Sequence, residues 1–353
     1  MSTTKPIGVY ILGGTGYGAG ELLRVLTAHP LVEVVGVSSR GSEGQPVTKA
    51  HPHLEGFYPD LTFSTEIALE KLAQYETGVL VSALPHGASA MAIAELEEAR
   101  SQLGIKVVDL SGAYRLQDPD SHARYYAEVE RPHSLSNKFE YGLTELNSEK
   151  IAKATHIANP GCLATASILS VAPISALLSP KFIAFDTKTG SSGSGRELKE
   201  ATHHPTRHGN FTAYKPLFHQ HEPEVLNCLY QHGLPVTQTN FIAQSLPIAR
   251  GIYVTTHIFN DHPLNPAEVQ TAFRDFALRH PFIRYRDTPP HLQHVLGTNF
   301  CDLAVAVDDN RIIVMAAIDN LVKGMTGQAV QNINLMAGMP EETGLFTPSL
   351  RPY

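Results

Sequence analysis

Hydrophobic and polar positions in the first half of the chain form two kinds of segment. Apolar runs typical of buried strands occupy residues 7–12, 32–39, 77–85 and 105–112. Residues 20–30 and 87–104 instead have helical spacing, and the first of these segments ends at Pro30. Strands that alternate with helices predict a parallel sheet with helices on both faces. We therefore expect an α/β domain over residues 1–160.

The pattern changes after residue 160. Partly alternating segments predict strands within residues 181–190, 239–260 and 299–319. Residues 265–280 have the spacing of a helix between two of these strands. Such an order is typical of an antiparallel or mixed sheet with helices on one face, so we expect an α+β domain over residues 161–320. A last helix, with small residues along one side, is expected to return to the first domain and complete it with residues 321–353.

Composition excludes several classes of partner. The 27 basic and 34 acidic residues give a net charge of −7, which argues against nucleic acid or an anionic membrane as a general partner. The sequence contains no apolar run of about 18 residues that would span a membrane, and it begins without the pattern of a signal peptide. Its 3 cysteines are too few and too scattered for a disulfide framework. These features predict a cytoplasmic enzyme.

Glycines are concentrated at the junction between the first predicted strand and the first helix. This segment contains Gly13, Gly14, Thr15, Gly16, Gly18 and Gly20. Glycines at such a junction allow the backbone to approach a pyrophosphate, and the helix N-terminus attracts its negative charge. The alternative is a merely tight turn between strand and helix. Because the glycines lie where a Rossmann-type fold requires them, we predict a dinucleotide site.

The end of the second predicted strand indicates which dinucleotide binds. NAD-binding domains usually place a carboxylate there, which holds the 2′-hydroxyl of the ribose. This chain instead has Ser38, Ser39 and Arg40, groups that suit a 2′-phosphate. Arg40 could also be an ordinary solvated loop arginine. The sequence therefore favours NADP(H) over NAD(H).

Cys162 follows the structure-breaking residues Asn159, Pro160 and Gly161 and begins an apolar helical run. A helix N-terminus lowers the pKa of a thiol and so favours the nucleophilic thiolate. Asn159 and nearby backbone N–H groups could help to hold an oxyanion. The alternative is a buried, inert cysteine. Two other cysteines, Cys228 and Cys301, lie inside ordinary helix and strand patterns and are expected in the core.

A histidine-rich segment can supply the acid or base that a nucleophilic cysteine needs. His219 and His221 are two residues apart and would share one face of an extended strand, and Glu224 could orient one imidazole. A zinc site built on the histidine pair is a competing interpretation, but no further ligand has suitable spacing, so we expect no metal. A dinucleotide, a cysteine and a histidine together indicate hydride reduction of a thioester to an aldehyde, or the reverse reaction.

Many motifs along the chain occur in a known order. They are "GGTGYGAGELLR", "SALPHGAS", "VVDLSGAYRL", "YGLTELN", "NPGCLATASIL", "GSSGSGRE", "HQHEPEV", "PIARGIYVT" and "AIDNLVKGMTGQAVQNIN". With these motifs the chain resembles, almost from end to end, the N-acetyl-gamma-glutamyl-phosphate reductases, relatives of aspartate-semialdehyde dehydrogenase in arginine biosynthesis. The resemblance implies an NADPH-dependent reductase of a small acyl phosphate that acts as a homodimer or homotetramer.

The resemblance also implies roles for individual residues. Cys162 would form the acyl-enzyme, and the acid/base would be His221 of the His219–His221 pair, with Glu224 behind it. The NADP site would include Gly13, Thr15, Gly16, Tyr17, Gly18, Ser39, Arg40 and Asn320. Candidates for binding the carboxylate or phosphate of the substrate are Ser111, Arg115, Arg196 and Arg250.

Two departures from the family pattern leave alternatives open. The family commonly has arginine where this chain has Gln220, which leaves less positive charge near an acyl phosphate. The segment "THHPTRHGNFTAYKP" is similar to a sister branch that reduces acyl phosphates attached to an acidic carrier protein, in lysine or arginine synthesis. A carrier-linked substrate is therefore the first alternative. A catalytically silent NADP-binding regulator and a zinc hydrolase are two further alternatives from other classes.

Overall fold

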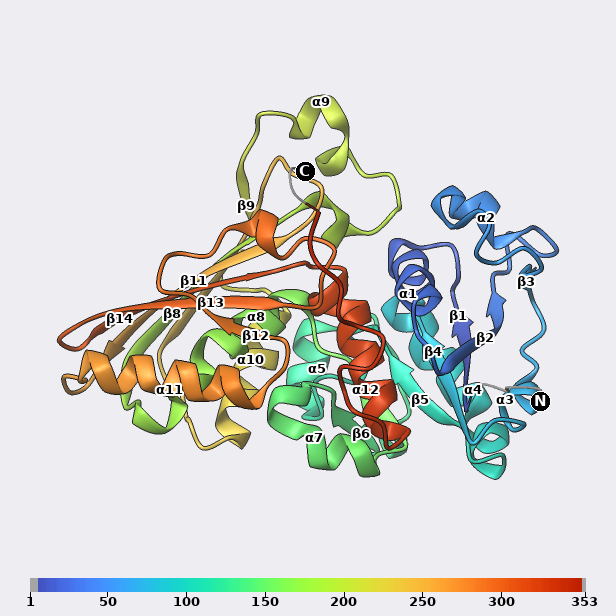
Figure 1. The fold of residues 1–353 in the computed structure, drawn as a ribbon, viewed down its shortest axis with the longest axis horizontal. Coiled ribbons are helices and arrows are strands. Elements are labelled where there is room, and N and C mark those ends of the chain that lie inside the picture. Colours follow the sequence, from blue (N-terminus) through green and yellow to red (C-terminus); the bar gives the residue numbers. More distant parts are fainter. Residues whose placement is uncertain (1–5, 351–353) are drawn as a thin grey trace. The chain divides into compact units, whose positions relative to one another are not determined.

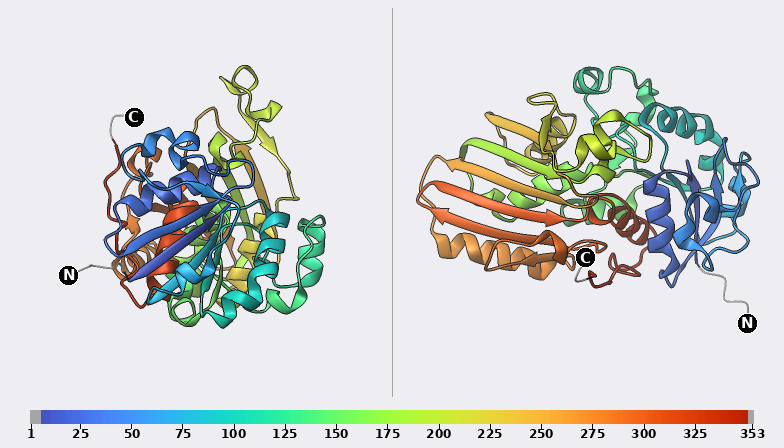
Figure 2. Two further views of the ribbon diagram at one scale, coloured as in Figure 1. Left: turned by 90° about the vertical axis from the view of Figure 1, so that its right-hand side faces the viewer. Right: turned by 90° about the horizontal axis from the view of Figure 1, so that it is seen from above.

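The structure is a computed structural model that describes residues 6–350 of the 353-residue chain. The chain divides into two compact units. The first contains residues 1–160 and 325–346, and the second contains residues 161–324 and 347–353. Figures 1 and 2 follow both units from the N-terminus to the C-terminus. In the part of the chain that the structure describes, no helix is long and apolar enough to cross a membrane.

The first unit is built on a seven-stranded sheet with the order β3-β2-β1-β4-β5-β7-β6. Every neighbouring pair in this sheet is parallel. Its strands are β1 (Ile7–Leu12), β2 (Val32–Ser38), β3 (Phe63–Ser64), β4 (Thr77–Ser82), β5 (Lys106–Asp109), β6 (Phe139–Tyr141) and β7 (His156–Ala158). All six residues of β1 are buried, as expected for an apolar strand covered on both faces. The predicted Rossmann-type α/β fold is confirmed.

The helices of this unit include the two that the periodicity predicts over residues 20–30 and 87–104, the predicted last helix, and others that it does not predict. They are α1 (Tyr17–Thr27), α2 (Val47–Ala50), α3 (Leu69–Leu72), α4 (His86–Gln102), α5 (Pro119–Tyr125), α6 (His133–Ser136), α7 (Thr144–Lys153) and α12 (Gly327–Met336). A short 3-10 helix, η1, covers Pro52–Leu54. The last helix, α12, packs on α7 and β5, so the predicted return of the C-terminal helix to the first unit is confirmed.

The second unit contains a mixed seven-stranded sheet with the order β12-β13-β14-β11-β8-β10-β9. Its strands are β8 (Pro180–Thr189), β9 (Thr212–Tyr214), β10 (Thr239–Ser245), β11 (Ile252–Asn260), β12 (Ile283–Tyr285), β13 (Cys301–Asp308) and β14 (Arg311–Ile318). Most neighbours are antiparallel, while β8 with β10 and β12 with β13 are parallel. Burial alternates along β11, so one face of the sheet lies in the core. The predicted α+β fold is confirmed.

Helix α8 (Cys162–Val171) is the central helix of the second unit. It packs on β11, β14 and α10, and every residue from Leu163 to Val171 is buried. A helix that is apolar on all sides is stable only inside a core. The other helices of this unit are α9 (His204–Arg207), α10 (His221–Gln231), α11 (Pro266–Arg279), the 3-10 helices η2 (Ala172–Leu177), η3 (Ser191–Ser194), η4 (Glu200–Thr202) and η5 (Leu292–His294), and the π-helix η6 (Val322–Thr326). The core thus fixes the position of Cys162 at the start of α8.

Candidate active site

Cys162 is the first residue of α8 and is only partly buried. The residue before it, Gly161, caps the helix without any side-chain hydrogen bond. Gly161 therefore offers no side-chain acceptor of its own to the first N–H groups of the helix, and the thiol lies at the positive end of the helix dipole. Both effects favour a thiolate. In contrast, Cys228 and Cys301 are buried, with 3% and 0% of their surfaces exposed.

Glu224 on α10 holds the turn in front of Cys162. Its Oε1 accepts a hydrogen bond of 2.6 Å from the backbone N–H of Gly161, and its side chain is almost completely buried. A short bond from a backbone N–H to a buried carboxylate is charge-assisted and therefore strong. The sequence analysis expected Glu224 to orient an imidazole. In the structure this carboxylate fixes Gly161, the residue that precedes Cys162.

The histidine pair does not lie on an extended strand, so that part of the sequence prediction is wrong. His221 is the first residue of α10, and His219 lies in the loop before it. Glu222, Pro223 and Glu224 in the first turn explain the difference, because proline is tolerated there and acidic side chains favour a helix N-terminus. The two imidazole rings are still close, with centroids 4.8 Å apart.

The tautomer of His219 follows from its hydrogen bond. The backbone N–H of His221 donates to Nδ1 of His219 at 3.1 Å, so Nδ1 carries no proton and Nε2 does. The ring also stacks on Phe241, with centroids 5.3 Å apart. Burial lowers the pKa of His219 to about 4, and the positive charge of Lys215 adds to this effect. His219 is therefore a neutral imidazole near pH 7 and a poor proton donor.

We expect His219 to stay neutral over the working range of the protein. Its pKa in the folded state is lowered from 6.5 to about 4, so its contribution to folding stability is present above 6.5 and is lost as the pH falls through about 4. A histidine NMR titration, with the signal assigned by its loss in His219→Asn, should show no change between about pH 7 and pH 5. A midpoint near the ordinary value of a histidine would contradict this prediction.

Tyr214 on β9 is a site residue that the sequence analysis missed. Burial raises its pKa, and the negative charge of Cys162 raises it further, so the phenol lies within electrostatic reach of the thiolate. Its ring also meets His219 edge to face, with centroids 5.6 Å apart. Arg207, in the same insert, donates hydrogen bonds to Ser245 and to the carbonyl of Leu246 and so ties the insert to the end of β10. Only the tyrosine's position within the segment of residues 202–216 could have indicated it.

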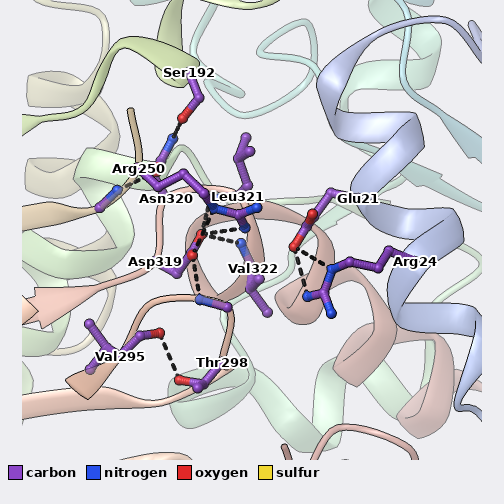
Figure 3. A network of polar contacts seen from close by, with 12 residues as sticks. Glu21, Arg24, Ser192, Arg250, Val295, Thr298, Asp319, Asn320, Leu321 and Val322 are labelled. Carbon is purple, nitrogen blue, oxygen red and sulfur yellow. Dashed lines mark hydrogen bonds and ion pairs between the residues drawn. The ribbon is translucent and has the colours of Figure 1, made fainter. Parts of the chain in front are cut away.

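Asn320 and Arg250 form part of one polar network in the second unit (Figure 3). The Oδ1 of Asn320 accepts from the N–H of Gly251 at 2.7 Å, and its Nδ2 donates to Oγ of Ser192 at 2.9 Å. The guanidinium of Arg250 binds the carboxylate of Asp319 through two N–H groups. Arg196 lies in the exposed loop after η3. Arg250 and Arg196 stay predicted substrate contacts, and Asn320 stays a predicted cofactor contact.

The glycine loop of the first unit has the features that a dinucleotide requires. Gly13 has a φ of +79°, which favours glycine. Gly16 begins helix α1 without a side-chain cap, and an added Cβ there would meet no atom within 4 Å. The backbone N–H groups of this open turn suit a pyrophosphate. Thr15 and Tyr17 flank Gly16, and the Tyr17 side chain is exposed.

The remaining predicted residues of the first unit lie in different surroundings. Gly18 lies in α1, Ser39 and Arg40 follow β2, and Arg40 is exposed. Ser111 is buried and donates from Oγ to Asp109 at 2.7 Å. Arg115 is also buried and donates to the carbonyl oxygens of Asn159 and Leu110 at 2.7 and 2.8 Å. These internal bonds favour positioning roles for Ser111 and Arg115 over direct contact with a substrate.

The side-chain amide of Asn159 makes hydrogen bonds within the first unit. The Nδ2 of Asn159 donates to the carbonyl of Met325 at 3.0 Å, and its Oδ1 accepts from Asn332 at 3.1 Å. This amide holds the chain ahead of Cys162, whereas the sequence analysis considered it for an oxyanion. In residues 6–350, no group of three His, Cys, Asp or Glu side chains is placed to bind a metal ion.

Comparisons with known proteins agree with this arrangement. Residues 8–154 match the family described as semialdehyde dehydrogenase, NAD binding domain, and residues 162–320 match semialdehyde dehydrogenase, dimerisation domain. Among solved structures, aspartate semialdehyde dehydrogenase II from Vibrio cholerae has a TM-score of 0.71 at 18% identity, covering 94% of this chain and 98% of that one. The enzyme from Candida albicans with NADP has a TM-score of 0.66 at 15% identity, covering 94% and 98%. These two structures share the fold.

Fold and domain matches together define the class of the protein, a semialdehyde dehydrogenase. A curated N-acetyl-gamma-glutamyl-phosphate reductase from Methanocella arvoryzae is 41% identical over 344 residues, which cover 97% of this chain and 98% of that protein. A protein of the same name from Methanopyrus kandleri is 39% identical over 348 residues, which cover 98% and 99%. The chain belongs to the N-acetyl-gamma-glutamyl-phosphate reductase family.

Proposed function

We propose that this protein reduces N-acetyl-gamma-glutamyl phosphate to N-acetylglutamate semialdehyde and phosphate through a thioester on Cys162. The observation that carries the proposal is the position of Cys162, at the N-terminus of a buried helix and next to a turn that Glu224 fixes. A thiolate held there is a nucleophile matched to an acyl phosphate. The family's name, borne by relatives that align over nearly the whole chain, supports the same substrate.

The reaction requires two chemical stages at Cys162. In the first, its thiolate attacks the γ-acyl carbon, a C–S bond forms, the C–O bond to phosphate breaks, and the leaving phosphate takes up the one proton that the cycle consumes. Bound NADPH supplies the hydride that reduces the resulting thioester. In the second, the hemithioacetal oxygen takes a proton. When the oxygen later loses this proton, the C–S bond breaks, the aldehyde is released and the thiolate is restored. Over the cycle, one acyl phosphate, one NADPH and one proton give one aldehyde, one NADP⁺ and one phosphate.

We assign the proton transfers to His221. It begins α10, the helix that also carries Glu224, and Glu224 bonds to the residue before Cys162. His219 is held as a neutral imidazole by burial, so it is the weaker candidate for donating a proton. We assign stabilisation of the oxyanion to backbone N–H groups in the first turn of α8. His219, from its contact with the His221 backbone, positions the start of the helix.

Residues of the first unit would hold the cofactor. The open turn at Gly16 and the N-terminus of α1 would bind the pyrophosphate, and Thr15 and Tyr17 flank it. Ser39 and Arg40 follow β2, and no carboxylate lies at the end of that strand. This favours a 2′-phosphate and hence NADPH. The cofactor site and the cytoplasmic location both stay predictions from the sequence.

We also propose that the second unit forms a homodimer through the sheet face opposite α8. Along β11, Tyr253, Thr255 and His257 are only partly buried, and Phe259 is 45% exposed. Ile313 on the neighbouring β14 is 38% exposed. A sheet face with this much exposed apolar surface is typical of an interface. The family description of a dimerisation domain over residues 162–320 supports the proposal, and light scattering of the purified protein tests it.

The reverse reaction tests the proposed function. Purified protein is mixed with N-acetylglutamate semialdehyde, phosphate and NADP⁺, and NADPH formation is followed by absorbance. The proposal predicts NADPH formation that depends on phosphate and is absent in Cys162→Ser. If NADP⁺ binds but no NADPH forms, the free acetylated substrate is wrong. Activity with a carrier-linked acyl phosphate alone would then support the alternative that the histidine-rich insert suggests.

A further inference from the structure

We propose that Asp319, which lies at the end of β14, is a positioning residue for the reaction at Cys162. One buried carboxylate holds two parts of the site. It orients the guanidinium of Arg250, and it fixes the turn that places Gly324 against Cys162. The proposal rests on the proposed function, because it concerns the nucleophile of that reaction.

The carboxylate of Asp319 has an unusually complete set of donors (Figure 3). Its side chain is fully buried. Oδ1 accepts from Arg250 Nη2 at 3.0 Å, from the N–H of Leu321 at 2.8 Å and from the N–H of Val322 at 3.1 Å. Oδ2 accepts from Arg250 Nε at 3.0 Å and from the N–H of Gly297 at 2.7 Å. A buried charge is tolerated only when it is paired and hydrogen-bonded in this way.

The second part of the argument is the turn that follows Asp319. The carbonyl of Asp319 accepts a hydrogen bond of 2.9 Å from the N–H of Gly324, and the π-helix η6 covers Val322–Thr326. π-Helical turns are rare and concentrate at functional sites. A Cβ added to Gly324 would lie only 2.7 Å from Cβ of Cys162, so the glycine backbone packs directly on the nucleophile. Through its side chain and carbonyl, Asp319 therefore positions the backbone segment that packs beside Cys162.

The third part is the loop that carries Arg250. Gly251 donates to Asn320, the neighbour of Asp319, and accepts from the N–H of Gly190 at 2.9 Å. The Arg250 side chain is 22% exposed, although two of its N–H groups bind Asp319. A guanidinium held along one edge by a carboxylate is already oriented before an anion arrives. Asp319 thus positions a cationic group and the nucleophile through a single side chain.

The second unit also offers a matched control for a purely structural role. Asp302 on β13 is fully buried as well, and its carboxylate binds Arg284 and Arg286 at 2.5 and 2.9 Å. Its burial, its charge and its arginine partners are therefore comparable with those of Asp319. Neither of these arginines belongs to the segment from Asp319 to Gly324 that adjoins Cys162. Replacing either aspartate removes a buried charge, but only one of them should affect the chemistry.

Asp319→Asn and Asp302→Asn are compared in two assays. The first is the rate at which iodoacetamide alkylates the protein without substrate, which reports on Cys162 because the other two cysteines are buried. The second is steady-state reduction, analysed as kcat and KM. We expect Asp319→Asn to slow alkylation several-fold and to raise KM about tenfold while kcat falls about tenfold. Asp302→Asn should leave the alkylation rate, kcat and KM within about twofold of the wild-type values. This should hold even if its melting temperature falls as much as that of Asp319→Asn.

Two further variants keep the test decisive if Asp319→Asn does not fold. Gly324→Ala adds one methyl group towards Cys162 and leaves the carboxylate intact, so it should slow alkylation and lower kcat with little change in KM. Arg250→Lys removes the two-point contact and should raise KM with alkylation unchanged. The proposal would be overturned if the two aspartate variants had equal effects. It would also be overturned if Gly324→Ala did not act on alkylation and kcat while Arg250→Lys acted on KM. If the wild-type protein has no reductase activity, the proposed function fails, and the alkylation assay still tests the positioning of Cys162.

Discussion

Cys162→Ser should lose at least about 10⁴-fold of its reductase activity, the largest effect that we expect from any single substitution. A serine hydroxyl at the same place stays protonated near pH 7, and the N-terminus of α8 cannot lower its pKa enough to give an alkoxide. Volume and packing change little, because the side chain is only partly buried. The loss should therefore appear in kcat, measured with saturating acyl phosphate and NADPH.

The control for this prediction is Cys228→Ser, in the middle of α10. This side chain is buried with 3% exposure, so the substitution places a hydroxyl in the core and should lower the melting temperature while activity at about 25 °C persists. NADPH binding, followed by fluorescence, should be unchanged in Cys162→Ser. Turnover within tenfold of the wild-type value in that variant would exclude the thioester pathway.

His221→Asn should lower kcat by about 10²- to 10⁴-fold, the range that general acid–base catalysis usually contributes. Asparagine keeps a hydrogen-bonding side chain at the start of α10, so the helix and the contact of Glu224 with Gly161 should persist. It cannot carry a proton to or from the hemithioacetal oxygen. His219→Asn should have a smaller effect, because burial keeps the His219 imidazole neutral.

The matched control for this prediction is His232→Asn, which changes the C-cap residue that follows the same helix. It should leave kcat within about twofold, because the residue lies at the far end of α10. If His219→Asn costs more than His221→Asn in the same assay, the assignment of the acid/base is reversed. The pH dependence of kcat for the two variants then identifies which imidazole titrates during turnover.

The main elements of both units could be predicted from the sequence because they are long and regular. Strand β1 is a continuous apolar run, and α4 has helical spacing over 17 residues. Strands β3 and β6 are not predicted, because they contain only two and three residues. Segments of that length have no measurable period, and they become strands only by pairing with neighbours already in the sheet.

Site residues could be predicted when the features that identify them are adjacent in the sequence. They could not be predicted when they depend on contacts between residues far apart in the sequence. Cys162 was identified from the turn and the helix that adjoin it. The bond of Glu224 to Gly161 joins residues 63 positions apart, and no spacing rule indicates it. Asp319 was missed for a similar reason, since its partners Arg250 and Gly297 come together only when the sheet forms. The prediction of an extended strand for the histidine pair fails because the next residues, Glu222, Pro223 and Glu224, favour the start of a helix.

The central claim is that the substrate is carried as a thioester on Cys162, and trapping that acyl-enzyme tests it most directly. Protein is mixed with N-acetyl-gamma-glutamyl phosphate in the absence of NADPH, quenched in acid within seconds, digested and examined by mass spectrometry. We expect an N-acetylglutamyl adduct on the peptide that contains Cys162, which disappears when NADPH is added before the quench. Aldehyde formation by protein that never acquires this adduct would contradict the claim.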